Sequence, residues 1–272
     1  MNNLSVQQSF IFAPLKQHKV INHFYKNMKG SIMKIVILFI LFSSLILAQD
    51  GGFFSGAGGR AYIDISTGPS FPLNNFGDDN PNNQRSGYAQ TGYSVGLSGG
   101  IRFLNLFEIS VVGFRNAYGT NLDNLIESFN QSNPGAGFNA SSDSWEIYGI
   151  LGGFGLSYPE GHGFFGDVKV LGGYLNSTSP EIMLRTSSED TYAKIESSTS
   201  SSLIYYFSGA VRRVLSDRLH LSLGLQYIWG SADFKNVKTI TSIGGNINES
   251  TASFQRNMYA WGLTLGLRFI LF

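Results

Sequence analysis

Residues 219–230 read LHLSLGLQYIWG and alternate strictly between large apolar side chains and small or polar ones. Alternation with a period of two indicates a β-strand whose two faces meet different surroundings. YSVGLSGGIRF at 93–103 and YAWGLTLGLRF at 259–269 repeat this pattern. Five further segments follow it less regularly: 60–68, 107–118, 144–157, 164–175 and 202–214. The chain therefore predicts an all-β protein of eight antiparallel strands, with a bulge near Gly152 and Gly153, where the apolar parity changes.

The links between these segments are short and long in alternation. The short links fall at about 105–106, 158–163 and 215–217, and the long links at about 69–87, 119–143, 176–201 and 231–256. All the long links must therefore leave the sheet at one end. A tilted strand crosses a bilayer with about 9 to 11 residues, and an even number of antiparallel strands with one short-turn end is typical of outer-membrane barrels. We expect an eight-stranded antiparallel up-and-down transmembrane β-barrel.

Composition excludes several other classes of protein. The 272 residues carry a formal net charge of +1, and only 14% of them are charged, whereas 14% are aromatic and 33 are glycine. So few charges argue against a nucleic-acid binder, a coiled coil or a disordered chain. The absence of cysteine excludes disulfides, thiolate zinc sites and cysteine nucleophiles.

A targeting segment is predicted near the N-terminus. Residues 35–47 read IVILFILFSSLIL and lie between Lys34 and Ala48. Thirteen residues without a charge are too few for a spanning helix but match the core of a signal peptide. We therefore predict that residues 1–48 are an N-terminal extension and cleaved signal peptide, and that residues 49–272 form the outer-membrane domain. Met1, Met28 and Met33 all remain open as the start.

Removal of this segment changes the charge balance. Residues 1–48 hold five lysines and no acid, so the rest of the chain has 14 basic and 18 acidic residues, a net charge of −4. Export also makes nucleic acid and cytoplasmic cofactors unsuitable as partners.

The signal ending LILAQ and the glycine-studded strands, with YAWGLTLGLRFILF as the last, resemble those of small eight-stranded outer-membrane barrels of the OmpA/OmpX type. The resemblance is to the PorT-like "outer membrane protein beta-barrel" group of Bacteroidetes in particular, and it covers about 58–272. It implies a porin-like fold in the outer membrane, contact with outer-membrane lipid, and biogenesis by the barrel-assembly machinery. A soluble lipocalin-like barrel is the alternative, because alternation alone does not show which face is inside.

If the apolar parity faces lipid, the opposite parity fills the lumen. An eight-stranded barrel is just wide enough for its own side chains, and charges of both signs can pair there. We expect a polar network without a wide pore, made by Arg60, Asp64, Arg102, Glu108, Glu146, Asp167, Lys169, Arg212, His220 and Arg268. Interfacial aromatic residues are expected at the long-loop ends of the apolar face: Trp145, Tyr174, Tyr227, Trp229, Tyr259 and Trp261. Arg213, on the apolar parity beside a short turn, is expected to reach the lipid head groups.

Two motifs suggest chemistry and are set aside. His220 and Ser222 resemble the His-x-Ser pair of lipid A deacylases, but the pair is predicted inside the barrel at its short-turn end. Asp78, Asp79 and Asn80 lack the spacing of a calcium loop. We therefore predict no catalytic, cofactor-binding or metal-binding residues.

The predicted protein is a non-enzymatic barrel whose long extracellular loops bind an extracellular or envelope protein or serve the envelope structurally. A narrow channel for small or hydrophobic solutes is the alternative. A secretion-machinery component, a lipid A hydrolase and a soluble binder are further alternatives.

Overall fold

The computed structural model describes residues 60–271, apart from 104–105, 162 and 188–189. The side chains of Arg60 and of residues 159–161 are not described either. Gly59–Phe272 forms one unit of the chain. The predicted signal segment and its boundary at residue 48 lie outside the described residues.

The predicted all-β antiparallel class is confirmed, although the described residues form twelve strands. Each of the eight predicted segments lies within or largely within a long strand. These strands are β1 (Arg60–Pro72), β2 (Ala89–Phe103), β3 (Phe107–Thr120), β5 (Trp145–Gly161), β6 (Phe164–Thr178), β9 (Thr199–Ser216), β10 (Leu219–Ile243) and β12 (Ala260–Ile270). The other elements are η1 (Asn74–Phe76), α2 (Asp123–Ser132), β4 (Asn139–Ser142), β7 (Ile182–Arg185), β8 (Tyr192–Ile195) and β11 (Asn246–Asn257).

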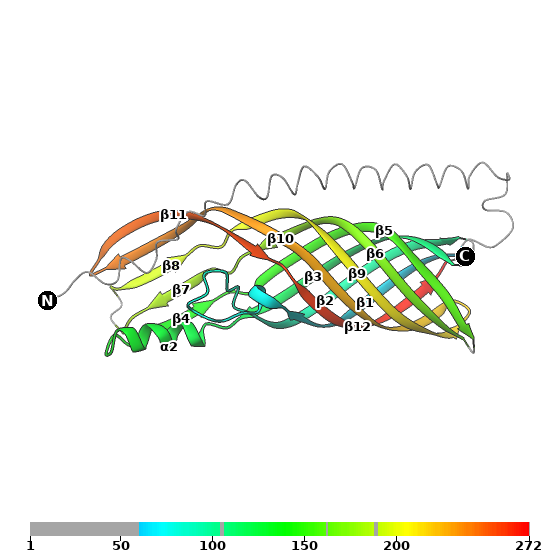
Figure 1. The fold of residues 1–272 in the computed structure, drawn as a ribbon, viewed down its shortest axis with the longest axis horizontal. Coiled ribbons are helices and arrows are strands. Elements are labelled where there is room, and N and C mark those ends of the chain that lie inside the picture. Colours follow the sequence, from blue (N-terminus) through cyan, green and yellow to red (C-terminus); the bar gives the residue numbers. More distant parts are fainter. Residues whose placement is uncertain (1–59, 104–105, 162, 188–189, 272) are drawn as a thin grey trace. The chain divides into compact units, whose positions relative to one another are not determined.

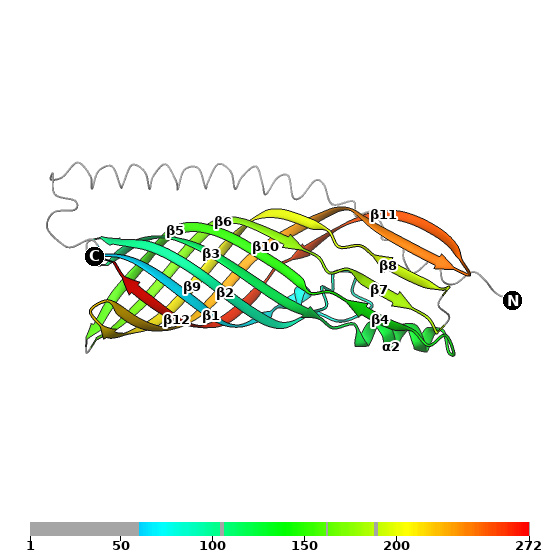
Figure 2. The same ribbon diagram turned by 180° about the vertical axis from the view of Figure 1, so that it is seen from behind.

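The eight long strands pair in chain order, and the pairing closes on itself. Each of them is antiparallel to its neighbours from β1 to β10, β10 also pairs with β12, and β12 pairs with β1. We call this closed set the ring. Figure 1 shows its strands crossing at a common tilt, and Figure 2 shows the same from behind.

The four additional strands are a correction to the prediction that the long links are loops. β10 continues beyond the ring and pairs with β11 and β8, β8 pairs with β7, and β7 pairs with β4. We call these strands, with the part of β10 after Gly230, the extension. It lies at the long-link end of the ring, together with α2 (Figure 1). Gly244 and Gly245, both at positive φ, make the tight turn between β10 and β11.

The two faces of the ring differ as alternation predicts. Large apolar side chains point outward, for example Ile150 at 71% and Leu223 at 55% exposure. The predicted bulge near Gly152 is wrong, because β3 and β5 pair without a register shift through Gly152 and Gly153. Even-numbered residues of β5 face outward along its whole described length, and odd-numbered residues face inward.

The sequence predicts a polar interior, but the interior is polar only in part. Towards the extension it is an apolar core, which includes Phe76 of η1, Trp145 of β5 and Phe234 of β10. On the short-turn side of this core, Tyr206 donates to Gln226 (3.0 Å), and Gln226 donates to Ser94 (3.0 Å), across the ring. The charged side chains lie at the opposite, short-turn end.

Among the residues that the structure describes, no helix is long and apolar enough to cross a membrane.

Candidate functional site

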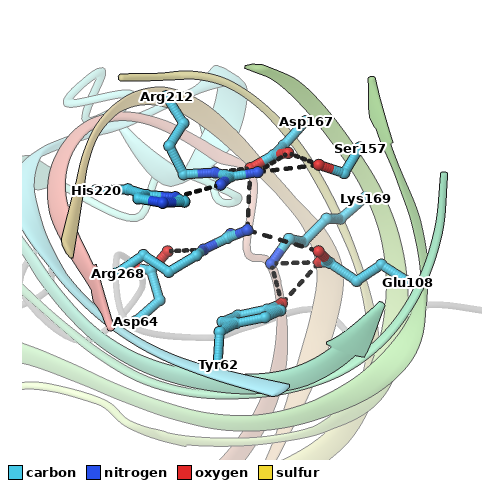
Figure 3. Close-up of polar contacts among 9 residues, drawn as sticks. All are labelled: Tyr62, Asp64, Glu108, Ser157, Asp167, Lys169, Arg212, His220 and Arg268. Atoms are coloured by element: carbon cyan, nitrogen blue, oxygen red, sulfur yellow. Dashed lines mark hydrogen bonds and ion pairs between the residues drawn. The ribbon is translucent and has the colours of Figure 1, made fainter. Parts of the chain in front are cut away.

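The candidate site is a network of ionisable side chains buried inside the ring. Seven of the nine members are charged or imidazole groups at inward positions, and Tyr62 and Ser157 complete the set (Figure 3). The inward parity of each strand brings them together from β1, β3, β5, β6, β9, β10 and β12. Three carboxylates face several cations here, so the cost of burying each charge is offset by a partner.

Arg212 is completely buried and contacts three other members of the network. Its Nε and Nη2 donate to the two carboxylate oxygens of Asp167, both at 3.0 Å, in a bidentate pair. Nη2 also donates to Ser157 Oγ (3.0 Å), and Ser157 donates to Asp167 (2.6 Å). Nη1 lies 2.6 Å from His220 Nδ1. A guanidinium has no acceptor, so Nδ1 accepts this hydrogen bond and the imidazole is neutral.

Arg268 links this pair to the other two carboxylates. Its Nε lies 3.2 Å from Asp64 Oδ2, and its Nη1 lies 3.2 Å from Asp167 and 3.6 Å from Glu108. Its guanidinium also lies over the ring of Tyr62, 3.9 Å from the centroid. One arginine therefore contacts an acid on each of three different strands.

Tyr62, Glu108 and Lys169 form a closed triangle beside it. Tyr62 donates to Glu108 Oε1 (2.7 Å), and Lys169 Nζ donates to the tyrosine oxygen (2.9 Å). Lys169 also pairs with the same carboxylate oxygen at 2.9 Å. The triangle holds a lysine and a glutamate in the interior without leaving either charge alone.

Arg102 stands apart from these pairs. It is 7% exposed, and its Nε has no hydrogen-bond partner. Its guanidinium lies 5.3 Å from the centroid of Phe165, and the guanidinium of Arg212 lies 4.6 Å from the same centroid. Arg102 is thus a buried cation near a second cation.

The structure places eight of the ten predicted network residues inside the ring: Asp64, Arg102, Glu108, Asp167, Lys169, Arg212, His220 and Arg268. The side chain of Arg60 is outside the described residues. Glu146 is a correction, because it lies on the outer face and forms a bidentate pair with Arg115 of β3, both contacts at 3.0 Å. It points outward because its neighbours Trp145 and Ile147 fill the apolar core.

The structure places most of the predicted interfacial aromatic residues on the outer face and one of them in the interior. Tyr174, Tyr227, Trp229 and Trp261 are exposed on the outer face, and Tyr259 is half-buried. Trp145 is a correction, because it is 3% exposed and donates its indole N–H to the carbonyl of Gly87 (2.9 Å). Its ring packs edge-on against Phe76 and Phe234 in the core.

Sequence reasoning missed Tyr62, Ser157 and Phe165 as members or neighbours of the network. Tyr62 shares the parity of Asp64, and Phe165 that of Asp167, so parity was a sufficient signal for both. Ser157 was hidden by the misplaced bulge in β5.

The acidic link after η1 uses its carboxylates internally. Asp78 accepts hydrogen bonds from Asn83 (2.5 Å) and from Ser86 (3.0 Å), and Asp79 accepts one from Asn121 (2.9 Å). The hydrogen bond from Asn83 is the main reason why the pKa of Asp78 is below its usual value. Within the described ranges, no group of three or more His, Asp or Glu side chains could hold a metal ion.

Comparison with known proteins gives structural similarities only. No family model and no curated protein sequence match the chain, so the PorT-like resemblance stays a prediction. Neisserial surface protein A covers 78% of this chain and 97% of its own, at 12% identity and a TM-score of 0.41. Ail of Yersinia pestis covers 78% and 99% (11% identity, TM-score 0.39), and the outer-membrane protein OprG of Pseudomonas aeruginosa covers 78% and 96% (12%, 0.42). At TM-scores below 0.5, such likeness is too weak to carry a function from one chain to another.

Proposed function

We propose that the ring is an eight-stranded transmembrane β-barrel of an outer membrane, and that the protein is non-enzymatic and acts through its extension as a binding or envelope-structural protein. The single observation that carries the membrane assignment is the apolar band on the outer face of the ring. Soluble monomers rarely expose contiguous apolar patches larger than a few hundred Å². Here every strand of the ring contributes outward-facing large apolar side chains.

The height of this band fits a bilayer. On β5, the outward positions of residues 148–158 are Tyr148, Ile150, Gly152, Phe154, Leu156 and Tyr158. Ten residue steps at about 3.3 Å span about 33 Å along the strand. At a tilt of about 40° this projects to about 25 Å, the apolar height of an outer-membrane barrel.

Polar and aromatic side chains mark both edges of the band. The ion pair of Arg115 and Glu146 lies towards the extension, and the guanidinium of Arg115 is within 6.0 Å of the ring centroids of Tyr93 and Tyr148. At the short-turn edge, the guanidinium of Arg213 lies 5.7 Å from the centroid of Phe164. Charged side chains cost little at such depths and far more at the midplane.

The filled interior favours binding over transport. The ion-pair network occupies the interior at the short-turn end, and the apolar core around Trp145 occupies it towards the extension. His220, one half of the motif that suggests hydrolysis, is buried and held by Arg212, which supports a non-enzymatic role. A narrow channel remains the alternative, with no specific contact in its favour.

In the proposed orientation the short turns face the periplasm and the extension faces outward. The tip of the β10–β11 hairpin exposes Ile243 and Ile247, at 51% and 65%. Among the described residues of the extension, these two are the large apolar side chains with the greatest exposure, which supports contact with an extracellular or envelope protein. Export through the signal segment of residues 35–47 and insertion by the barrel-assembly machinery belong to the same proposal.

Two measurements test the proposal. With the chain expressed in a Gram-negative host, trypsin added to intact cells should cut the extension and leave the ring protected. Cleavage that requires opened cells would reverse the orientation. In planar bilayers the purified protein should show no large, salt-dependent conductance, and a stable conductance would establish the channel alternative instead.

A further inference from the structure

The charges of the described side chains buried in the ring do not balance. Among the described residues, the buried interior holds four permanent cations, Arg102, Lys169, Arg212 and Arg268, and three carboxylates, Asp64, Glu108 and Asp167. Lys169, Arg212 and Arg268 each lie within 4 Å of at least one of these carboxylates. Arg102 is the cation in excess.

Arg102 lies directly opposite Glu108 in the pairing of β2 with β3, and both side chains point inward. Glu108 nevertheless pairs with Lys169, Tyr62 and Arg268 instead. The guanidinium of Arg102 is left at the short-turn end, beside Phe165 and near Arg212. Its Nε is buried without a hydrogen-bond partner, and none of the three carboxylates lies within ion-pair distance of it among the described residues. Burying a charge with incomplete pairing is unfavourable, so this position favours a counter-ion.

We propose that the short-turn end of the ring binds a small oxyanion at Arg102, with phosphate as its representative. A guanidinium presents two parallel N–H groups that match two oxygens of such an anion. Arg212 and Arg268 add positive potential at Arg102, which the carboxylates of Asp167 and Glu108 partly offset. The half-buried Phe165 forms an apolar wall. The remaining exposure of Arg102 leaves a route from solvent.

The site concerns the interior alone, so it does not depend on what the extension binds. One bound anion would bring the buried charge close to zero. Its expected effect is stabilisation of the folded state, because a ligand that binds only the folded protein shifts unfolding by mass action.

The test is thermal unfolding of the full chain in zwitterionic detergent micelles, followed by tryptophan fluorescence, with phosphate added at constant ionic strength. The wild-type midpoint should rise and then saturate with phosphate, and chloride should have a smaller effect. In R102Q the midpoint should not respond to phosphate. R213Q, which removes the neighbouring arginine on the outer face, should respond like the wild type.

R102K keeps the positive charge but lacks the planar guanidinium and its two parallel N–H groups. It should need about tenfold more phosphate for half of the effect, the loss expected for one charge-assisted hydrogen bond. Equal responses of the wild type and R102Q, including no response by either, would overturn the proposal. If R102Q does not fold, an equal effect of chloride and phosphate on the wild type, or an undiminished response in R102K, would overturn it.

Discussion

Replacement of Arg212 by methionine tests whether the ion-pair network stabilises the fold. The change removes both hydrogen bonds to Asp167 and those to Ser157 and His220, all between 2.6 and 3.0 Å. Asp167 keeps only the hydroxyl of Ser157 (2.6 Å) and Arg268 (3.2 Å). Breaking one partner of a buried pair costs about 3–5 kcal/mol, and we expect R212M to lower the free energy of unfolding by that amount.

The assay is urea-induced unfolding in phosphatidylcholine vesicles, followed by tryptophan fluorescence. R213Q is the matched control, because Arg213 is the next residue and faces outward, and its change should stay within about 0.5 kcal/mol. Adding Asp167→Leu to R212M should cost less than the sum of the two single changes, since no carboxylate is then left without its arginine. An R212M protein within about 1 kcal/mol of the wild type, or strict additivity, would refute the account of the network.

Three further predictions concern the outer face, the strand backbone and the link after η1. L223R should lower the free energy of unfolding in vesicles by about 2–4 kcal/mol, as for a charge at the bilayer midplane, whereas L223A should cost much less; equal losses would contradict the facing of β10. G172A should fold normally, because a Cβ there would first meet another atom at 3.8 Å. G173A should not fold, because its Cβ would meet the carbonyl of Ile150 and lie 2.8 Å from Leu151 Cα. Heat-modifiable migration on a gel distinguishes the two variants, and equal folding of both would contradict the packing of β6 against β5. Because the pKa of Asp78 is lowered in the folded link, its contribution to the stability of the link is complete above about pH 4 and is lost as the pH falls through the folded pKa. Amide exchange at Ser86 should therefore become faster, relative to its intrinsic rate, below about pH 4, and D78N should not show this pH dependence.

The ring was predictable because large apolar side chains predominate on its outer face. Every outward position from Leu221 to Trp229 in β10 and from Trp261 to Phe269 in β12 carries a large apolar side chain, so the period of two is clear in the sequence. The facing of Asp64, Asp167 and Arg268 follows directly from that parity. The position of Arg102 away from the three carboxylates does not follow from parity, because it depends on side-chain geometry.

The errors in β5 have one physical cause. Near the extension the interior is an apolar core, so Trp145, Ile147 and Leu151 are large and apolar although they face inward. Polarity there no longer separates the two faces, and the apolar parity seems to change at Gly152. That apparent change reversed the predicted facing of Trp145 and Glu146.

The extension was hidden for a different reason. Its strands are four residues long in β4, β7 and β8, and their burial pattern does not alternate strongly. β8 pairs with the distant part of β10, β7 pairs with β8, and β4 pairs with β7, so backbone pairing rather than a local pattern holds them. Such long-range pairing overrides the Asn- and Ser-rich composition that predicts loops.

The chain has no cysteine, so single cysteines can be placed and spin-labelled without background along residues 148–158 of β5. The most direct measurement is the accessibility of each label, in lipid vesicles, to oxygen, which concentrates in lipid, and to a water-soluble nickel complex. The transmembrane ring predicts that labels at even-numbered positions between Tyr148 and Tyr158 are accessible to oxygen and not to the nickel complex. Labels at odd-numbered positions should be shielded from both. Even-numbered positions that meet the nickel complex would show that the outer face contacts water, and would contradict the central claim.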